Sequence, residues 1–434
     1  MGLQLRATAS TTAAAAAPHT HRRLGAKENA RIALVGINYA PELTGIAVYN
    51  TGLAEYLAAQ GHEVDMYTGF AYYPAWAKAP ADRGRLFRFE RCQGVNLRRH
   101  FLYVPSRPTA LRRMLHELSF VFSVSLGYLA GPRAAVTFVV SPPLLLGLPI
   151  ALLARLKRSR LVFHVQDLQP DAALETGLLK PGHFARALLV LERCTYALVD
   201  RVSTISRAMR ARIQAKGVGQ GKTMLFANWA NNDRVRPRDP DTEYRRAWRL
   251  EGRFIVLYSG NLGVKQGLDV LLDCARLSRG DPNLAFVIVG DGGEREALVA
   301  RARREGLDNV QFHPLQPEER LSELLATANL AVIPQRRGVT DIVLPSKLAN
   351  ILAAERAVIA TAHEASELAR TLWQAQCGTV VPPGDAAALS KAIARLRAAP
   401  VELARMGANG RRYATERLSR DAVLPRARDE LLSL

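Results

Sequence analysis

A lysine at the predicted start of a helix has the clearest implication for chemistry. Residues 340–361 read TDIVLPSKLANILAAERAVIAT, and Ser346 is a good N-cap because its hydroxyl can accept hydrogen bonds from the free amides of the first turn. Lys347 follows, although a cation in the first turn opposes the helix dipole by roughly 0.3–1 kcal/mol. A charge-assisted hydrogen bond to a bound anion contributes roughly 1.5–3 kcal/mol, which exceeds this cost of opposing the dipole. We therefore predict that Lys347 and the amides around Ser346 hold a diphosphate.

Residues 258–272 (YSGNLGVKQGLDVLL) form a second candidate anion site, at a turn between a strand and a helix. Glycines let backbone amides approach a ligand there, and a lysine adds positive charge. The residues of this turn that we expect to contact a donor are Gly260, Asn261, Lys265 and Gln266. A third turn, residues 289–296 (VGDGGERE), contains Gly290 and acidic side chains, so we expect it to pack beside a nucleoside rather than a phosphate.

Polar residues in the first half of the chain are candidates for the acceptor side and for catalysis. Residues 161–174 (LVFHVQDLQPDAAL) place His164 and Asp167 at the carboxyl end of a predicted strand. A histidine inside an apolar strand is more often a satisfied core residue, so both interpretations of His164 stay open. Residues 36–50 lack the GxGxxG dinucleotide fingerprint. We assign Glu42 and Gly45 to an acceptor loop there, with a plain tight turn as the alternative for Gly45.

Strand-like and helix-like runs alternate throughout, which is typical of parallel sheets covered by helices on both faces. We predict two doubly wound, Rossmann-like α/β domains at residues 30–228 and 250–410, joined by a polar, proline-containing linker at 229–249. A final helix at 411–434 is free to pack back on the first domain. Because ligands bind beyond the carboxyl ends of parallel strands, two such domains facing each other would form one central cleft.

The short predicted helix that carries Lys347 has two distinct faces. Leu348, Ile351 and Leu352 recur at positions i, i+3 and i+4, so this face is predicted to point into a core. Lys347 and Asn350 lie together on another face.

Composition favours an anionic partner but not a nucleic acid. The 434 residues include 59 Lys and Arg against 39 Asp and Glu, a net charge of +20. Such a charge suits nucleic acid, an acidic membrane surface or phosphorylated small molecules. The arginines are spread along the whole chain and only 7% of residues are aromatic, so no nucleic-acid signature emerges. The isolated Cys92, Cys194, Cys274 and Cys377 suggest reduced, buried thiols of a cytoplasmic protein and no zinc site.

Three segments bear on membrane association. Residues 1–29 lack the apolar core of a secretory signal, and we interpret them as a disordered basic tail. Residues 134–154 are uncharged, but Ser141-Pro142-Pro143 interrupts them, so a buried strand and a helix explain them better than a membrane span. Residues 105–131 combine arginines with a long apolar face. They form either a core helix or a helix that lies on an anionic membrane surface.

The order of several motifs resembles one known family. GINYAPELTGIAVYNTGLAEYLAAQGHEV, YYPAW, YVPSRPTALRRMLHELSF, HVQDLQPDA, VSTISRAM, YSGNLGVKQGLDVL and VLPSKLANILA follow one another as in the WcaI-type glycosyltransferases of family 4, regarded as colanic-acid biosynthesis fucosyltransferases. The resemblance implies a GT-B fold and a retaining transfer from a nucleotide-sugar, GDP-fucose, without a metal or other cofactor. It implies a lipid-linked saccharide as acceptor, at the cytoplasmic face of the inner membrane.

The chain departs from the wider family where many members have two glutamates eight positions apart. Asn350 stands at the second position, and the first falls at Ile342, beside Asp341. By this resemblance Asp341 holds sugar hydroxyls and Asn350 the ribose, while Lys265 and Lys347 hold the diphosphate. The usual Arg and Lys of the second-domain glycine turn are matched by Asn261 and Gln266. A UDP-linked N-acetyl-sugar donor, a non-catalytic GT-B scaffold and a basic nucleic-acid-binding protein remain as alternatives.

Overall fold

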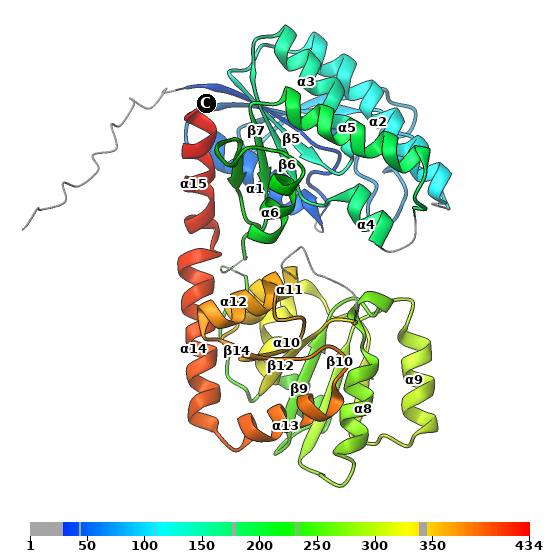
Figure 1. The fold of residues 1–434 in the computed structure, drawn as a ribbon, viewed down its shortest axis with the longest axis vertical. Coiled ribbons are helices and arrows are strands. Elements are labelled where there is room, and N and C mark those ends of the chain that lie inside the picture. The colour runs from blue at the N-terminus through cyan, green and yellow to red at the C-terminus, as the bar shows by residue number, and fades with distance from the viewer. Residues whose placement is uncertain are drawn as a thin grey trace, which may run out of the picture.

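The computed structural model describes residues 29–42, 45–107, 109–175, 179–230, 232, 234–337 and 345–434, without the side chains of Ala110, Glu175, Lys265 and Ser346. Asn29 is the one residue of the predicted tail within this range, and Asp341 lies outside it. The described chain forms an upper and a lower α/β domain in Figure 1, with the last two helices running along one side of both.

The first domain is built on an eight-stranded sheet of order β3-β4-β2-β1-β5-β6-β7-β8. Only the edge pair β3–β4 is antiparallel, and the remaining pairs are parallel. Helices cover both faces, so strands such as β5 are buried along their whole length. The strand bounds are β1 Arg31–Val35, β2 Glu63–Gly69, β3 Phe87–Cys92, β4 Val95–His100, β5 Val136–Ser141, β6 Arg160–Val165, β7 Arg201–Thr204 and β8 Thr223–Leu225.

The helices of the first domain lie in two layers. Phe120, Ile150 and Phe163 belong to the core between the sheet and α2, α3 and α5, which lie side by side in Figure 1. Leu53 and Leu57 belong to the core on the opposite face, under α1. The helix bounds are α1 Ile46–Ala59, α2 Ala110–Ala130, α3 Gly147–Leu156, α4 Gln169–Glu175, α5 His183–Leu198 and α6 Arg207–Ala215.

The uncharged segment 134–154 is a buried strand followed by a helix. Its first part is β5, and its second part is α3, which begins at Gly147 after the Ser141-Pro142-Pro143 interruption. The interpretation as a strand and a helix is therefore confirmed. In the part of the chain that the structure describes, no helix is long and apolar enough to cross a membrane.

The second domain has a six-stranded, all-parallel sheet of order β11-β10-β9-β12-β13-β14. Its strands are nearly continuous apolar runs because helices cover both faces. The strand bounds are β9 Phe254–Ser259, β10 Leu284–Val289, β11 Val310–His313, β12 Leu330–Pro334, β13 Val358–Thr361 and β14 Gly378–Val381. The helix bounds are α7 Glu243–Ala247, α8 Asp269–Leu277, α9 Arg295–Arg304, α10 Leu321–Thr327, α11 Ser346–Ala353, α12 Glu367–Ala375 and α13 Ala386–Arg397.

The end of the chain is two helices rather than the single predicted helix over 411–434. α14 spans Pro400–Arg417 and α15 spans Arg420–Leu432. The break has a local cause: the Ser419 hydroxyl accepts from the amide of Ala422 and starts α15, while the carbonyl of Leu418 accepts from the amide of Ala230 at 2.6 Å. Leu424 and other apolar residues of α15 then pack in the core under α1, so the chain end spans both domains.

Two of the four cysteines differ from the prediction. Cys274 and Cys377 are buried, as the sequence suggests, whereas Cys92 and Cys194 are exposed. Cys92 ends the edge strand β3, which has a neighbouring strand on one side only. All four are free thiols.

Candidate functional site

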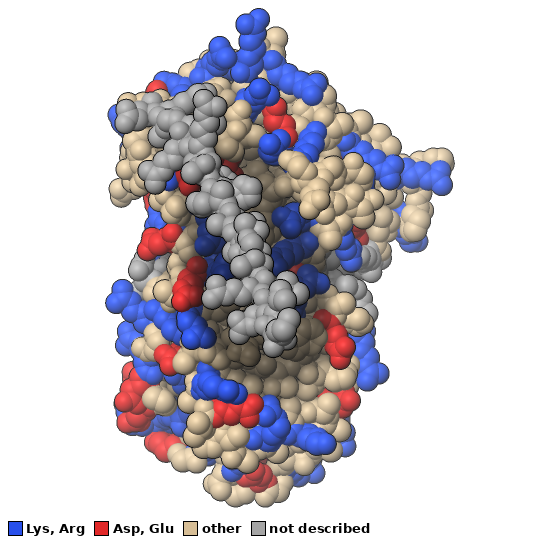
Figure 2. Space-filling model, turned by 60° about the vertical axis from the view of Figure 1, so that its left-hand side comes forward, with Lys and Arg blue, Asp and Glu red and all other residues tan. Residues whose placement is uncertain are grey.

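A cavity of about 560 Å³ lies at the carboxyl edge of the second sheet, and we call it the α11 cavity. Figure 2 shows the molecule hollowed between its upper and lower parts, with Lys and Arg atoms visible inside the hollow. The cavity is lined by Asn228, Leu257, Ser259, Gly260, Asn261, Gln266, Leu321, Leu325, Ala331, Ile333, Pro334, Gln335, Pro345, Lys347, Asn350 and Ile351. It therefore brings together five of the residues predicted to contact the donor: Gly260, Asn261, Gln266, Lys347 and Asn350.

The ammonium group of Lys347 is held in a defined position in this cavity. Its Nζ donates to the hydroxyl of Tyr258 at 2.9 Å and lies 4.3 Å from the centroid of that ring. The Tyr258 hydroxyl in turn donates to the carbonyl of Asn261 at 2.6 Å. Burial raises the pKa of Tyr258, so the ring stays a neutral phenol that can accept from the lysine. The cation is thus oriented beside the glycine turn before any ligand arrives.

Two glycines shape the turn opposite Lys347. Gly260 has φ +145°, and a Cβ built on it would lie 2.9 Å from the Lys347 Nζ. Gly290 has φ +144°, and a Cβ there would lie 1.9 Å from the carbonyl oxygen of Gly260. Gly290 is absent from the residues that line the α11 cavity, so its place is behind the Gly260 turn. It sets the shape of the site rather than its surface.

The start of α11 differs from the prediction in one respect. The helix begins at Ser346, so Pro345 and not Ser346 occupies the N-cap position. Pro345 has φ −57° and ψ 124°, an extended conformation that enters the helix without a side-chain cap. The predicted core face is confirmed, since Leu348, Ile351 and Leu352 are buried. Lys265 lies in a short 3-10 turn, Val264–Gln266, whose last residue lines the same cavity.

His164 lies in the core of the first domain and not at a cavity. Its ring is 1% exposed and stacks on Phe138 with 5.1 Å between the ring centroids, and Nδ1 is 3.0 Å from the Ser203 hydroxyl. Burial lowers the pKa of His164 to about 3, so the ring is neutral at physiological pH. This is the environment of a core histidine, and we withdraw the catalytic assignment.

Asp167 and its neighbour lie at the carboxyl end of β6, on the cleft side. Asp167 is exposed, whereas Gln166 is buried. The side-chain amides of Gln166 and Asn228 exchange two hydrogen bonds, at 3.0 and 2.9 Å. Asn228 also lines the α11 cavity, so this pair links a first-domain strand to the predicted donor site. Sequence reasoning missed Asn228, which stands at the boundary between the predicted first domain and the linker.

Glu42 has a supporting role in the loop that follows β1. The side chain is buried, and its carboxylate accepts from the amides of Tyr72 and Tyr73, both at 2.9 Å, and from the side-chain amide of Asn38 at 2.8 Å. These three hydrogen bonds hold the loop in place, and the assignment of Glu42 to an acceptor loop stays a prediction. Gly45 has φ +63° with no atom within 4 Å of a built Cβ, so backbone conformation rather than crowding favours glycine there.

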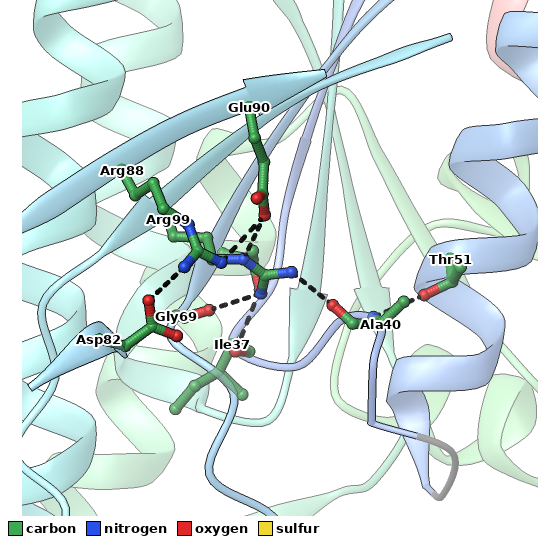
Figure 3. A network of polar contacts seen from close by, with 9 residues as sticks. Ile37, Ala40, Thr51, Gly69, Asp82, Arg88, Glu90 and Arg99 are labelled. Carbon is green, nitrogen blue, oxygen red and sulfur yellow. Dashed lines mark hydrogen bonds and ion pairs between the residues drawn. The ribbon is translucent and has the colours of Figure 1, made fainter. Parts of the chain in front are cut away.

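A buried arginine connects the loops at the carboxyl edge of the first sheet, as Figure 3 shows. Arg99 is 4% exposed and donates to the carbonyls of Ala40 at 2.6 Å and Gly69 at 3.4 Å. It also pairs with Glu90 at 2.7 Å. The loop after β1 and the end of β2 are therefore held together by one guanidinium group, which sequence reasoning did not identify.

The chain matches two protein families over most of its length. Residues 240–413 match the family described as "Glycosyl transferases group 1", and residues 44–229 match the "Glycosyl transferase 4-like domain". The chain is 39% identical over 347 residues to the putative colanic acid biosynthesis glycosyl transferase WcaI of Escherichia coli (strain K12), covering 78% of this chain and 84% of that one. It is 27% identical over 278 residues to the probable glycosyltransferase WbjE of Pseudomonas aeruginosa, covering 63% and 69%.

Solved structures show the same fold. The sucrose-phosphate synthase of Thermosynechococcus elongatus superimposes with a TM-score of 0.72 at 21% identity, covering 93% of this chain and 98% of that one. HepE of Anabaena, in complex with UDP, gives 0.68 at 16% identity, covering 93% and 100%. Two facing α/β domains with a cavity at a carboxyl sheet edge form the GT-B fold, and the family matches show that the chain is a glycosyltransferase. The chain belongs to the WcaI-type glycosyltransferases of family 4, and its predicted fold class is confirmed.

Proposed function

We propose that this enzyme transfers a sugar from a nucleoside diphosphate sugar to a lipid-linked saccharide during exopolysaccharide biosynthesis. The observation that carries the proposal is the Lys347 ammonium group, which is held against Tyr258 in a cavity of about 560 Å³. A volume of this size suits a nucleotide-sugar. The structure of HepE, a protein of the same fold, in complex with UDP supports the same kind of donor.

The lining of the α11 cavity suits the parts of such a donor. We assign the diphosphate to Lys347 and the amides at the start of α11, because a cation and a helix N-terminus both favour negative charge. The amide of Asn350 faces the same cavity and is assigned to the ribose. Leu321 and Leu325 supply an apolar wall against which a base can pack. We take GDP-fucose as the donor on the strength of the resemblance, with a UDP-linked N-acetyl-sugar as the competing choice.

Transfer in this site would be driven by electrostatics. The bond between the anomeric carbon and the diphosphate oxygen breaks, and the acceptor hydroxyl oxygen bonds to that carbon on the same face of the sugar. The hydroxyl proton passes to the departing phosphate. Negative charge grows on the diphosphate as it leaves, and the preorganised Lys347 and helix amides stabilise it most in the transition state. We propose that no metal ion or other cofactor is required.

An apolar surface on the first domain supports association with a membrane. α2 is apolar on two faces: Phe120 and Val124 are in the core, whereas Phe122 is 69% exposed. The further exposed apolar residues of the α2, α3 and α5 layer are Leu111, Met114, Leu115, Leu118, Leu126, Leu129, Leu152, Leu156, Phe184 and Val190. Large exposed apolar patches mark interaction sites, and the exposed Arg107 and Arg112 near the start of α2 favour anionic lipid. We propose that this face lies on the cytoplasmic side of the inner membrane.

Thermal unfolding with candidate ligands tests the proposal. A ligand at a hundred times its dissociation constant stabilises the folded protein by about 2.7 kcal/mol, so its melting shift is easily measured. GDP, UDP, their fucose and N-acetylhexosamine conjugates and a short duplex DNA are compared, and transfer is then assayed with the effective donor, with and without EDTA. We expect a shift with one nucleoside diphosphate and none with DNA. The absence of a shift with every nucleotide would favour a non-catalytic scaffold instead.

A further inference from the structure

The loop after β2 contains an aromatic cluster that the proposed donor chemistry does not use. This aromatic loop, residues 72–76 (YYPAW), packs against His116 of α2. The Tyr72 ring centroid is 5.3 Å from that of Trp76 and 4.4 Å from that of His116. Tyr73 is 43% exposed, and Trp76 has φ +50°, a conformation that a bulky residue rarely adopts and that concentrates at binding sites.

The protein holds this loop in place with buried polar groups. The Glu42 carboxylate accepts from the amides of Tyr72 and Tyr73. His116 is 2% exposed and donates from Nδ1 to the carbonyl of Tyr103, while its Nε2 has no hydrogen-bond partner among the described residues. Burial lowers the pKa of His116, so the ring is neutral, and its buried Nε2 lies out of a ligand's reach. Tyr73, which is exposed, and Trp76, which is partly exposed, thus offer flat apolar faces on a loop that buried polar groups hold in place.

Positive charge lies directly beside the aromatic loop. The Arg113 guanidinium is 5.5 Å from the centroid of the Trp76 ring, and Arg107 and Arg112 precede it. All three arginines are exposed, and α2 has no acidic residue in its first turn. As with Lys347, cations at a helix N-terminus oppose the dipole, so a bound anion would relieve an unfavourable arrangement.

The geometry of a helix orders these features around α2. Successive residues are rotated by roughly 100°, so Leu111, Leu115, Leu118 and Phe122 form one outward stripe. Arg113 and His116 point roughly to the opposite side, toward the aromatic loop, and Arg112 lies between the two sides. Along the surface, therefore, an exposed apolar stripe is followed by a guanidinium group and then by aromatic rings.

From this arrangement we infer that the acceptor is a saccharide carried on a lipid phosphate and that it binds across α2. The first sugar stacks on Tyr73 and Trp76, the phosphate meets Arg112 and Arg113, and the lipid chain follows the stripe that begins at Leu111. Pyranose rings have apolar faces that pack on aromatic rings, and guanidinium groups recognise phosphate. This inference rests on the proposed function and extends it, since it names the residues that select the acceptor.

Binding of two probes that differ by the sugar tests the inference on the full-length chain. The probes are a glucosyl group joined through phosphate to a farnesyl chain, and farnesyl phosphate alone. Trp76→Leu and Tyr73→Ala should each raise the dissociation constant of the glycosylated probe about tenfold, which is the effect of losing about 1.4 kcal/mol of stacking. Their affinity for farnesyl phosphate should stay within a factor of about two. Arg113→Gln should weaken both probes.

Matched controls come from the second domain. Trp373 is 50% exposed on α12 and Arg304 is exposed on α9, so Trp373→Leu and Arg304→Gln should leave both probes unaffected. The melting shift caused by a nucleoside diphosphate should be unchanged in every variant, which shows that each one is folded with its donor site intact.

The outcomes separate this inference from the proposed function. Equal affinity of the wild type and the folded Tyr73→Ala and Trp76→Leu variants for the glycosylated probe would overturn the inference, as would no binding of that probe by the wild type. A probe that binds through Trp76, in a protein that no nucleotide stabilises and that transfers no sugar, would instead overturn the proposed function and leave the saccharide site standing.

Discussion

Replacing Lys347 with methionine tests the electrostatic role of the α11 cavity most directly. Methionine is an unbranched, uncharged side chain of similar shape and lacks the ammonium group, which in Lys347 lies 2.9 Å from the Tyr258 hydroxyl and faces the cavity. A charge-assisted hydrogen bond to a diphosphate contributes roughly 1.5–3 kcal/mol, so affinity for a nucleoside diphosphate should fall about 10- to 150-fold. Turnover should fall by at least as much, because charge on the leaving diphosphate grows in the transition state.

The fold should tolerate this substitution. The variant loses the cation–π contact with Tyr258, worth about 0.5–1 kcal/mol at such a site, but the Tyr258 hydroxyl keeps its bond to the Asn261 carbonyl at 2.6 Å. We therefore expect only a small decrease in the free energy of unfolding. Lys391 on α13 is exposed, and Lys391→Met serves as the matched control with unchanged binding.

Calorimetric titration with a nucleoside diphosphate and with the corresponding nucleoside separates phosphate binding from base binding. Lys347→Met should weaken the diphosphate and leave the nucleoside unaffected, since the lysine meets only the phosphates. A folded Lys347→Met protein that binds the diphosphate and turns over like the wild type would refute the assignment. Equal loss for nucleoside and diphosphate would show a distorted cavity instead of a lost charge.

Three further outcomes follow from the structure. In a denaturant titration, Gly290→Ala should destabilise the fold by more than about 1 kcal/mol and should also weaken donor binding, because its Cβ would lie 1.9 Å from the Gly260 carbonyl oxygen. Gly293→Ala should be nearly neutral in the same titration, because a Cβ built there has no atom within 4 Å. The pKa of His164 is lowered to about 3 in the folded protein, so below about pH 6.5 the unfolded chain binds one proton more and the free energy of unfolding falls with pH. His164→Phe should make this fall less steep by up to about 1.4 kcal/mol per pH unit, and equal slopes for the wild type and the variant would contradict the prediction. Phe122→Asp should reduce sedimentation with anionic vesicles, and binding of the wild type to these vesicles should weaken as the salt concentration rises. Equal binding of the wild type to neutral and anionic vesicles would exclude the membrane proposal.

The sequence by itself determined the features that repeat along the chain. Alternating apolar strands and periodic helices predict two parallel α/β sheets, and the i, i+3, i+4 spacing of Leu348, Ile351 and Leu352 predicts the buried face of α11. Glycine turns at strand ends predict where a donor cavity forms, because parallel strands present their carboxyl ends at one edge. The cavity lining of Gly260 and Lys347 follows from these local rules.

Tertiary structure alone decided what each polar residue does, because its partners are distant in sequence. The Glu42 carboxylate accepts from amides 30 and 31 residues away, and Arg99 donates to a carbonyl 59 residues away. Asn228, which lines the cavity, is hydrogen-bonded to Gln166, 62 residues away. His164 became a core residue because Phe138 and Phe226 cover it. A periodic pattern reports which face of an element is buried, but hydrogen-bond partners and access to solvent depend on how elements meet, which no local spacing encodes.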